Sequence, residues 1–93
     1  MSVIIQSTFV HKRFKKEFKE WNQLDKCKVE KILRLVKAIK KDPFRGIGKP
    51  EPLKFVFAGC WSRRIDGTHR LVYKVENGEL QLMSCKYHYS KQQ

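Results

Sequence analysis

Glu51 is the only carboxylate of this chain that stands between two prolines, Pro50 and Pro52. Proline fixes its own backbone dihedral and restricts the residue before it, so this carboxylate is presented with little freedom. Lys49 and Lys54 lie close to it in the sequence. A positioned carboxylate is a candidate general base. The alternative is a surface loop carboxylate that the neighbouring lysines neutralise.

A second candidate group lies on the stretch from Trp61 to Tyr73, where Asp66-Gly67 predicts a hairpin turn. Its basic side chains are expensive to bury without anionic partners; they are Arg63, Arg64, His69 and Arg70. A three-residue loop would set Arg64 opposite Arg70, and this pair of like charges would favour a phosphate between them. A two-residue loop would send the two arginines to opposite faces. The alternative is a solvated basic hairpin.

A third group lies near the C-terminus. Alternation along a last strand from Leu80 to about Tyr87 places Ser84, Lys86 and His88 on one face, and Met83, Cys85, Tyr87 and Tyr89 on the core face. A carboxylate, a histidine and several cations are the groups that cleavage of RNA without a metal requires. The 2′-hydroxyl must lose a proton, the leaving oxygen must gain one, and cations must hold the phosphorane. The alternative for His88 is a solvent-exposed ring.

Metal and cofactor sites are not indicated. His11, His69 and His88 are far apart, and the three cysteines, Cys27, Cys60 and Cys85, form no closely spaced pair. We therefore predict neither a metal nor a cofactor. The odd number of cysteines favours buried thiols in a reducing cytoplasm over a disulfide framework. The opening apolar run Val3-Ile4-Ile5 is too short for a signal peptide or a membrane span, so we expect a cytoplasmic location.

The composition restricts the class of partner. The 93 residues predict one domain, residues 1–93, with one modest core. The chain has 21 lysines and arginines against 9 acidic residues, a formal charge of +12, which predicts a polyanionic partner. With 41% hydrophobic residues, the chain is too apolar for a disordered basic tail.

The elements that must position these groups follow from periodicity. Residues 2–7 predict a strand, residues 9–22 and 24–41 two amphipathic helices, and Asp42-Pro43 a helix end. Strands are then expected at 55–58, on both sides of Asp66-Gly67, and after the second hairpin turn, Asn77-Gly78. We therefore expect an α+β fold of order β-α-α-β-β-β-β. Its two helices would cover one face of a twisted, mainly antiparallel sheet and leave the other open as a basic cradle.

Four blocks of the sequence, in this order, resemble the YoeB/Txe toxins of the RelE superfamily. They are Gly46 to Lys54, Trp61 to Ile65, His69 to Tyr73, and Tyr87 to Tyr89. The resemblance implies a microbial-RNase-like fold and a bacterial type II toxin that cleaves mRNA in the ribosomal A site without a metal, inhibiting translation. It also implies inhibition by an acidic antitoxin of the Phd/YefM type, and a homodimer is a further expectation.

The same resemblance assigns roles to individual residues. Glu51 corresponds to the general base, His88 to the general acid and Arg70 to the cation at the transition state. The remaining site residues would bind RNA or phosphate: Lys49, Lys54, Arg64, Lys86 and Tyr89. Lys86 stands where arginine is common, and the tail from Ser90 to Gln93 extends past a tyrosine that often ends the chain.

The sequence leaves three other functions open. One is a ParE-like toxin that targets gyrase, against which Glu51, Arg70 and His88 together argue. Another is a basic RNA- or ribosome-binding module without catalysis, which explains the charge but not the Pro-Glu-Pro block. A degenerate toxin that only binds an antitoxin is a third case.

Overall fold

The structure is a computed structural model and describes residues 4–86. Its elements in chain order are β1 (Ser7–Val10), α1 (Lys12–Leu24), α2 (Lys26–Lys41), β2 (Glu51–Pro52), the 3-10 helix η1 (Phe55–Phe57), β3 (Trp61–Arg64), β4 (Arg70–Glu76) and β5 (Glu79–Ser84). The predicted α+β class and the order β-α-α-β-β-β-β are confirmed. Within the described residues, neither helix is both long enough and apolar enough to cross a membrane.

The five strands form one sheet in the order β1-β5-β4-β3-β2. β1 runs parallel to β5, and the other neighbours are antiparallel. Asn77 and Gly78 join β4 to β5 with φ angles of 53° and 78°, the left-handed conformations that a two-residue hairpin requires. The mainly antiparallel sheet and this second hairpin are therefore as predicted.

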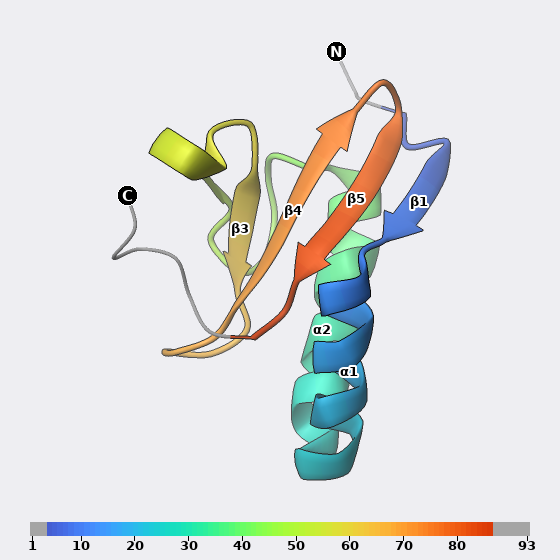
Figure 1. Ribbon diagram of the computed structural model, residues 1–93. Helices are drawn as coiled ribbons and strands as arrows, with labels where there is room; N and C mark the ends of the chain where they lie inside the picture. Colours follow the sequence, from blue (N-terminus) through green and yellow to red (C-terminus); the bar gives the residue numbers. More distant parts are fainter. Residues whose placement is uncertain (1–3, 87–93) are drawn as a thin grey trace.

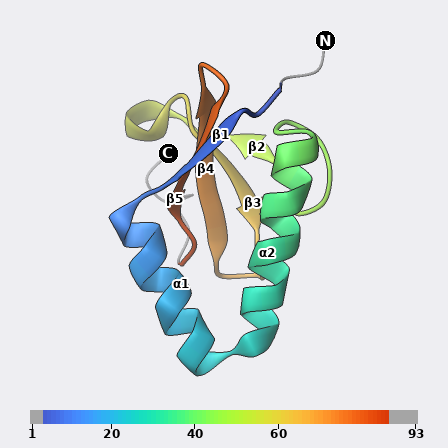
Figure 2. The ribbon, with the colours of Figure 1, turned by 90° about the vertical axis from the view of Figure 1, so that its right-hand side faces the viewer.

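The two helices form an antiparallel pair that covers one face of the sheet (Figures 1 and 2). Asp25 joins them: its side chain accepts a hydrogen bond of 2.9 Å from the amide of Cys27 and caps α2. The core between helices and sheet consists of Phe14, Trp21, Ile32, Leu35, Ile39, Ile65, Leu71, Tyr73, Leu80, Leu82 and Cys85. This core fixes α1 against β5, the strand that leads to the C-terminal segment.

The first strand begins later than predicted. β1 covers Ser7–Val10, so α1 begins at Lys12 rather than at Phe9. Val10 fits the helical spacing of the apolar residues, but it pairs with Leu82 of β5 instead. Backbone pairing with a neighbouring strand overrides helical periodicity here, because β1 completes an edge of the sheet.

The strand predicted at 55–58 is wrong. Phe55 has a positive φ of 56° and begins the short helix η1, whereas the strand of this region is Glu51–Pro52. β2 tolerates its proline because it is an edge strand. The loop carrying η1 also covers part of the sheet face that we expected to be open. There Leu53, Cys60 and Val72 form a second small cluster with Phe57 and Met83.

Candidate active site

Glu51 and Arg70 meet on the face of the sheet opposite the helices. Glu51 pairs with Ser62 across β2 and β3, and Arg70 lies on β4. The Nη1 atom of Arg70 donates to Glu51 Oε1 at 2.6 Å and to Ser62 Oγ at 3.1 Å. The Arg70 side chain is 15% exposed and that of Glu51 is 55% exposed. The structure therefore brings the predicted base and the predicted cation into direct contact and leaves the carboxylate open to solvent.

Arg64 lies directly opposite Arg70 in the β3–β4 register. This register is the one that a three-residue loop predicts, and it places both guanidinium groups on one face of the sheet. Arg64 is exposed and, within residues 4–86, forms no ion pair. Two arginines side by side with one carboxylate leave a positive charge that an anion can neutralise.

The hairpin that carries these arginines is closed by Asp66. Its Oδ1 atom accepts hydrogen bonds from the amides of Thr68 and His69 at 2.8 and 2.6 Å, and its Oδ2 atom lies 3.0 Å from Lys28 Nζ on α2. Partial burial would raise the pKa of Asp66, but the two amide bonds and the ammonium lower it to about 2. The hairpin tip is thereby tied to the helix pair.

Lys49 and Lys54 flank the short strand β2 and are both exposed. Lys49 has a positive φ of 50° and directly follows Gly48, whose carbonyl accepts a bond of 2.6 Å from the Arg64 amide. This backbone bond joins the loop before Glu51 to the strand that carries Arg64. Both lysines therefore lie on the loops that position the candidate base.

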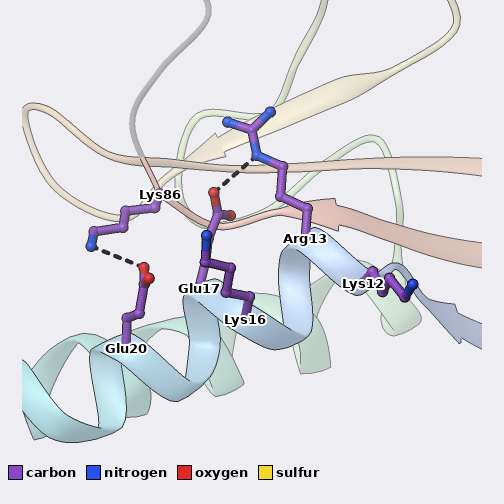
Figure 3. A pocket seen from close by; sticks show the side chains of 6 residues that line it. All are labelled: Lys12, Arg13, Lys16, Glu17, Glu20 and Lys86. Atoms are coloured by element: carbon purple, nitrogen blue, oxygen red, sulfur yellow. Dashed lines mark hydrogen bonds and ion pairs between the residues drawn. The ribbon is translucent and has the colours of Figure 1, made fainter.

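Lys86 contacts α1. Its Nζ atom lies 3.1 Å from Glu20 Oε1 and 5.7 Å from the centroid of the Trp21 ring. Figure 3 shows Lys86 and Glu20 in a pocket that Lys12, Arg13, Lys16 and Glu17 also line. The ammonium of Lys86 thus has a carboxylate partner, whereas the family resemblance implies RNA or phosphate as its ligand. The other two predicted residues, His88 and Tyr89, lie outside the described residues.

Arg63 was a candidate for binding an anion, but the structure gives it a different role. Its side chain is fully buried, although we predicted that a buried arginine here would need an anionic partner. Its partners are neutral oxygens: Nε donates to Tyr73 Oη, Nη1 to the Ile47 carbonyl, and Nη2 to the carbonyls of Asp42 and Arg45. Because Asp42 ends α2, the guanidinium binds the negative end of that helix. Arg63 is therefore a structural residue.

The alternation of side chains along the strand indicates that Arg63 is buried. Trp61, Arg63 and Ile65 alternate on one face of the strand, and the two apolar neighbours identify that face as the core. Ser62, which alternates with Arg64 on the other face, was also missed, because a single serine carries no pattern of its own.

Among residues 4–86, no group of three or more histidine, cysteine, aspartate or glutamate side chains is placed to hold a metal ion.

The fold defines the class of protein. The structure of a YoeB/ParE toxin from Agrobacterium tumefaciens is similar with a TM-score of 0.87 and 40% identity, covering 90% of this chain and all of that one. A heterotetrameric YoeB-YefM complex and a YoeB dimer, both from Staphylococcus aureus, have TM-scores of 0.81 and 0.83. They share 42% and 41% identity, and the alignments cover 88% and 91% of this chain and 95% and 99% of the other. The fold is thus that of the RelE-type toxins.

Sequence comparison gives the family. The YoeB toxin of Synechocystis is 51% identical over 71 residues, 76% of this chain and 83% of the relative. That of Streptomyces coelicolor is 48% identical over 73 residues, 78% and 87% of the two chains. Residues 9–89 match the family described as YoeB-like toxins of bacterial type II toxin-antitoxin systems, and this chain belongs to that family.

Proposed function

We propose that this toxin is an endoribonuclease that cleaves mRNA in the ribosomal A site and so inhibits translation. The observation that carries the proposal is the contact of 2.6 Å between Arg70 and Glu51 on the face opposite the helices, with Arg64 opposite Arg70. A carboxylate beside two guanidinium groups can take a proton from a nucleophile and hold the anion that forms. The family and its fold support the same reading.

In this mechanism Glu51 removes the proton of the 2′-hydroxyl as that oxygen attacks the adjacent phosphorus. The bond from phosphorus to the 5′-oxygen then breaks, and His88 donates a proton to the departing oxygen. Arg70 stabilises the charge that develops on the phosphorane, and Arg64 holds the same phosphate. The role of His88 rests on its position in the family's terminal Tyr-His-Tyr block.

The RNA strand would be bound by cations around this centre. Lys49 and Lys54 are exposed on both sides of Glu51 and can reach neighbouring phosphates. Tyr89 would stack on a base. The ammonium of Lys86 forms an ion pair with Glu20 in the structure, so Lys86 would have to leave this carboxylate before it could bind a phosphate. The formal charge of +12 favours approach to the ribosome, itself a polyanion.

An acidic antitoxin is the second partner that we propose. The toxin of Staphylococcus aureus is described in a heterotetrameric complex with YefM, and also as a dimer. We infer that this chain binds a YefM-like antitoxin in the bacterial cytoplasm and forms a homodimer. An acidic antitoxin segment would neutralise the same arginines and lysines that bind RNA.

A single-turnover experiment tests the role of Arg70. Because this cation acts on the developing charge, Arg70→Ala should lower the cleavage rate on programmed ribosomes by about 100-fold or more while changing ribosome affinity little. Lys37→Ala removes one positive charge from the exposed face of α2 and serves as the matched control. A loss of affinity with an unchanged single-turnover rate would contradict this role.

A further inference from the structure

A β-bulge changes the face on which side chains lie at the end of β5. Tyr73 pairs with Leu82, but Val72, the residue before it on β4, pairs with Ser84, so Met83 is an extra residue on β5. The bulge breaks the simple alternation that would place Met83 and Cys85 on one face. Cys85 lies in the core between the helices and the sheet, whereas Met83 packs against the small cluster on the face opposite the helices.

Met83 and Ser84 line a pocket of about 270 Å³ on the face opposite the helices. Its apolar part also includes Phe57 of η1, Cys60 and Val72. Its rim is basic, because His11, Lys12 and Arg13, at the start of α1, complete the lining. The volume lies near the lower end for small-molecule sites, roughly 300 Å³, which suits a single planar ring.

The sheet register connects this pocket to the candidate active site. Glu51 pairs with Ser62, Ser62 with Val72, and Val72 with Ser84. These four residues form one row across β2, β3, β4 and β5, with all their side chains on the same face. Glu51 stands at one end of the row, and Val72 and Ser84, at the other end, belong to the pocket. A strand of RNA held at Glu51 and Arg70 can therefore reach the pocket along the sheet.

The charges of the rim suit a phosphate. Arg13 is already paired with Glu17 at 3.0 Å, and His11 Nε2 lies 3.2 Å from Gln81 Oε1. Lys12 is exposed and has no ion pair in the part of the chain that the structure describes. It also stands in the first turn of α1, where the helix dipole disfavours a cation unless an anion is near.

We infer that this pocket binds one nucleobase of the RNA substrate, next to the nucleotide whose bond is cleaved, with the phosphate of that base on Lys12. The assignment of the ligand to the cleaved RNA rests on the proposed function. The ring lies against Phe57 and Met83, which offer an aromatic face and a polarisable thioether. The pocket thus holds the base that flanks the cleavage site.

Methionine NMR tests the inference directly, because the chain contains only two methionines, Met1 and Met83. The protein is labelled with ¹³C in its methionine methyl groups, and Met83→Leu assigns the Met83 signal. The probe is a 2′-O-methyl triadenylate, which has no 2′-hydroxyl to attack. The ring current of a bound adenine should shift the Met83 signal. An abasic backbone of equal charge should leave the signal in place. An equal shift with both probes, or none with either, would overturn the inference.

Two pairs of variants sharpen the test. Phe57→Ala should weaken triadenylate binding about tenfold, whereas Phe55→Ala, on the same turn but outside the pocket, should not. Lys12→Gln should reduce the salt dependence of binding by about 0.7 in log-log slope, and Lys19→Gln, also exposed on α1, should not. Equal effects within either pair would contradict the inference.

The outcome is independent of the nuclease test. A Met83 shift specific to the base, in a protein that cleaves no RNA on ribosomes, would keep the base pocket and reject the proposed activity. Cleavage by a protein whose Met83 signal never moves would reject the pocket and keep the activity.

Discussion

Arg63 and Arg64 are adjacent on β3 and project to opposite faces of the sheet. Arg63 is fully buried and donates hydrogen bonds to four oxygens, whereas Arg64 is exposed and lies opposite Arg70. One arginine of the pair thus secures the loop that follows α2, and its neighbour remains available for an anion. A substitution of Arg63 should therefore lower stability, whereas a substitution of Arg64 should affect anion binding and leave stability nearly unchanged.

Arg63→Lys should lower the free energy of unfolding by at least about 2 kcal/mol. Lysine keeps the charge but cannot reach Tyr73 and three carbonyls at once. Arg64→Lys, on the other face, should change stability by less than about 0.5 kcal/mol. Urea unfolding of both variants measures the difference, and equal losses would show that Arg63 is not the buried anchor.

Gly48 should resist substitution because Arg63 and α2 pack against it. A Cβ at this position would lie 2.8 Å from Leu35 Cδ2 and 3.0 Å from Arg63 Cβ, and its φ is +85°. Gly59 has a similar φ of +95°, yet a Cβ there meets nothing within 4 Å. Gly59→Ala should cost about 1 kcal/mol from backbone strain alone. Gly48→Ala should cost about 1–3 kcal/mol more from crowding.

Thermal or urea unfolding of these two variants separates backbone strain from packing. If both lost the same amount of stability, the close approach of Leu35 and Arg63 to Gly48 would carry no energetic weight.

Asp66 should make stability depend on acid pH. Its pKa falls from 3.8 to about 2 on folding. Its contribution is therefore fully present above about pH 4 and is lost as the pH falls through about 2. From the size of the shift, this contribution is roughly 2 kcal/mol. Unfolding curves of Asp66→Asn should lie below those of the wild type by up to this amount at pH 7 and converge with them near pH 2.

Lys28→Met isolates the part of this effect that comes from the ion pair. It should cost less than about 1 kcal/mol, because the Lys28–Asp66 pair is partly exposed and the two amide bonds to Asp66 remain. A difference between wild type and Asp66→Asn that stayed constant from pH 7 to pH 2 would refute the low pKa of Asp66.

The three cysteines should react at very different rates. Cys27 is exposed, whereas Cys60 and Cys85 are buried, and burial raises the pKa of both buried thiols. Iodoacetamide at pH 8 should therefore modify one thiol rapidly in the native protein and all three in urea. Cys27→Ser should abolish the rapid phase. A second thiol that reacts as fast in the folded protein would contradict the packing around Cys60 or Cys85.

Periodicity and turn chemistry predicted most of the fold. Asp66-Gly67 and Asn77-Gly78 located both hairpins, and Asp42-Pro43 located the end of α2, because these signals are local. The position of β1 and the helix η1 could not be predicted in this way. β1 depends on pairing with β5, which is distant in sequence, and η1 depends on the positive φ of Phe55, which the residue type disfavours.

The candidate site shows the same division. The hairpin predicted that Arg64 and Arg70 would face each other, since loop length sets the register. The contact of Glu51 with Arg70 joins two elements that no local pattern relates, and family resemblance alone linked them beforehand. The ion pair of Lys86 with Glu20 could not be predicted from the family resemblance, because Glu20 lies on α1 and the resemblance has no matching block there.

Primer extension on a defined mRNA in a translating extract tests the central claim most directly, with wild type beside Glu51→Gln. We predict cleavage inside the A-site codon by the wild type, and none on the same RNA without ribosomes. The cleavage rate of Glu51→Gln should be lower than that of the wild type by at least about 100-fold. Equal cleavage by both proteins would remove Glu51 from the chemistry. Absence of cleavage by the wild type on active ribosomes would contradict the proposed nuclease itself.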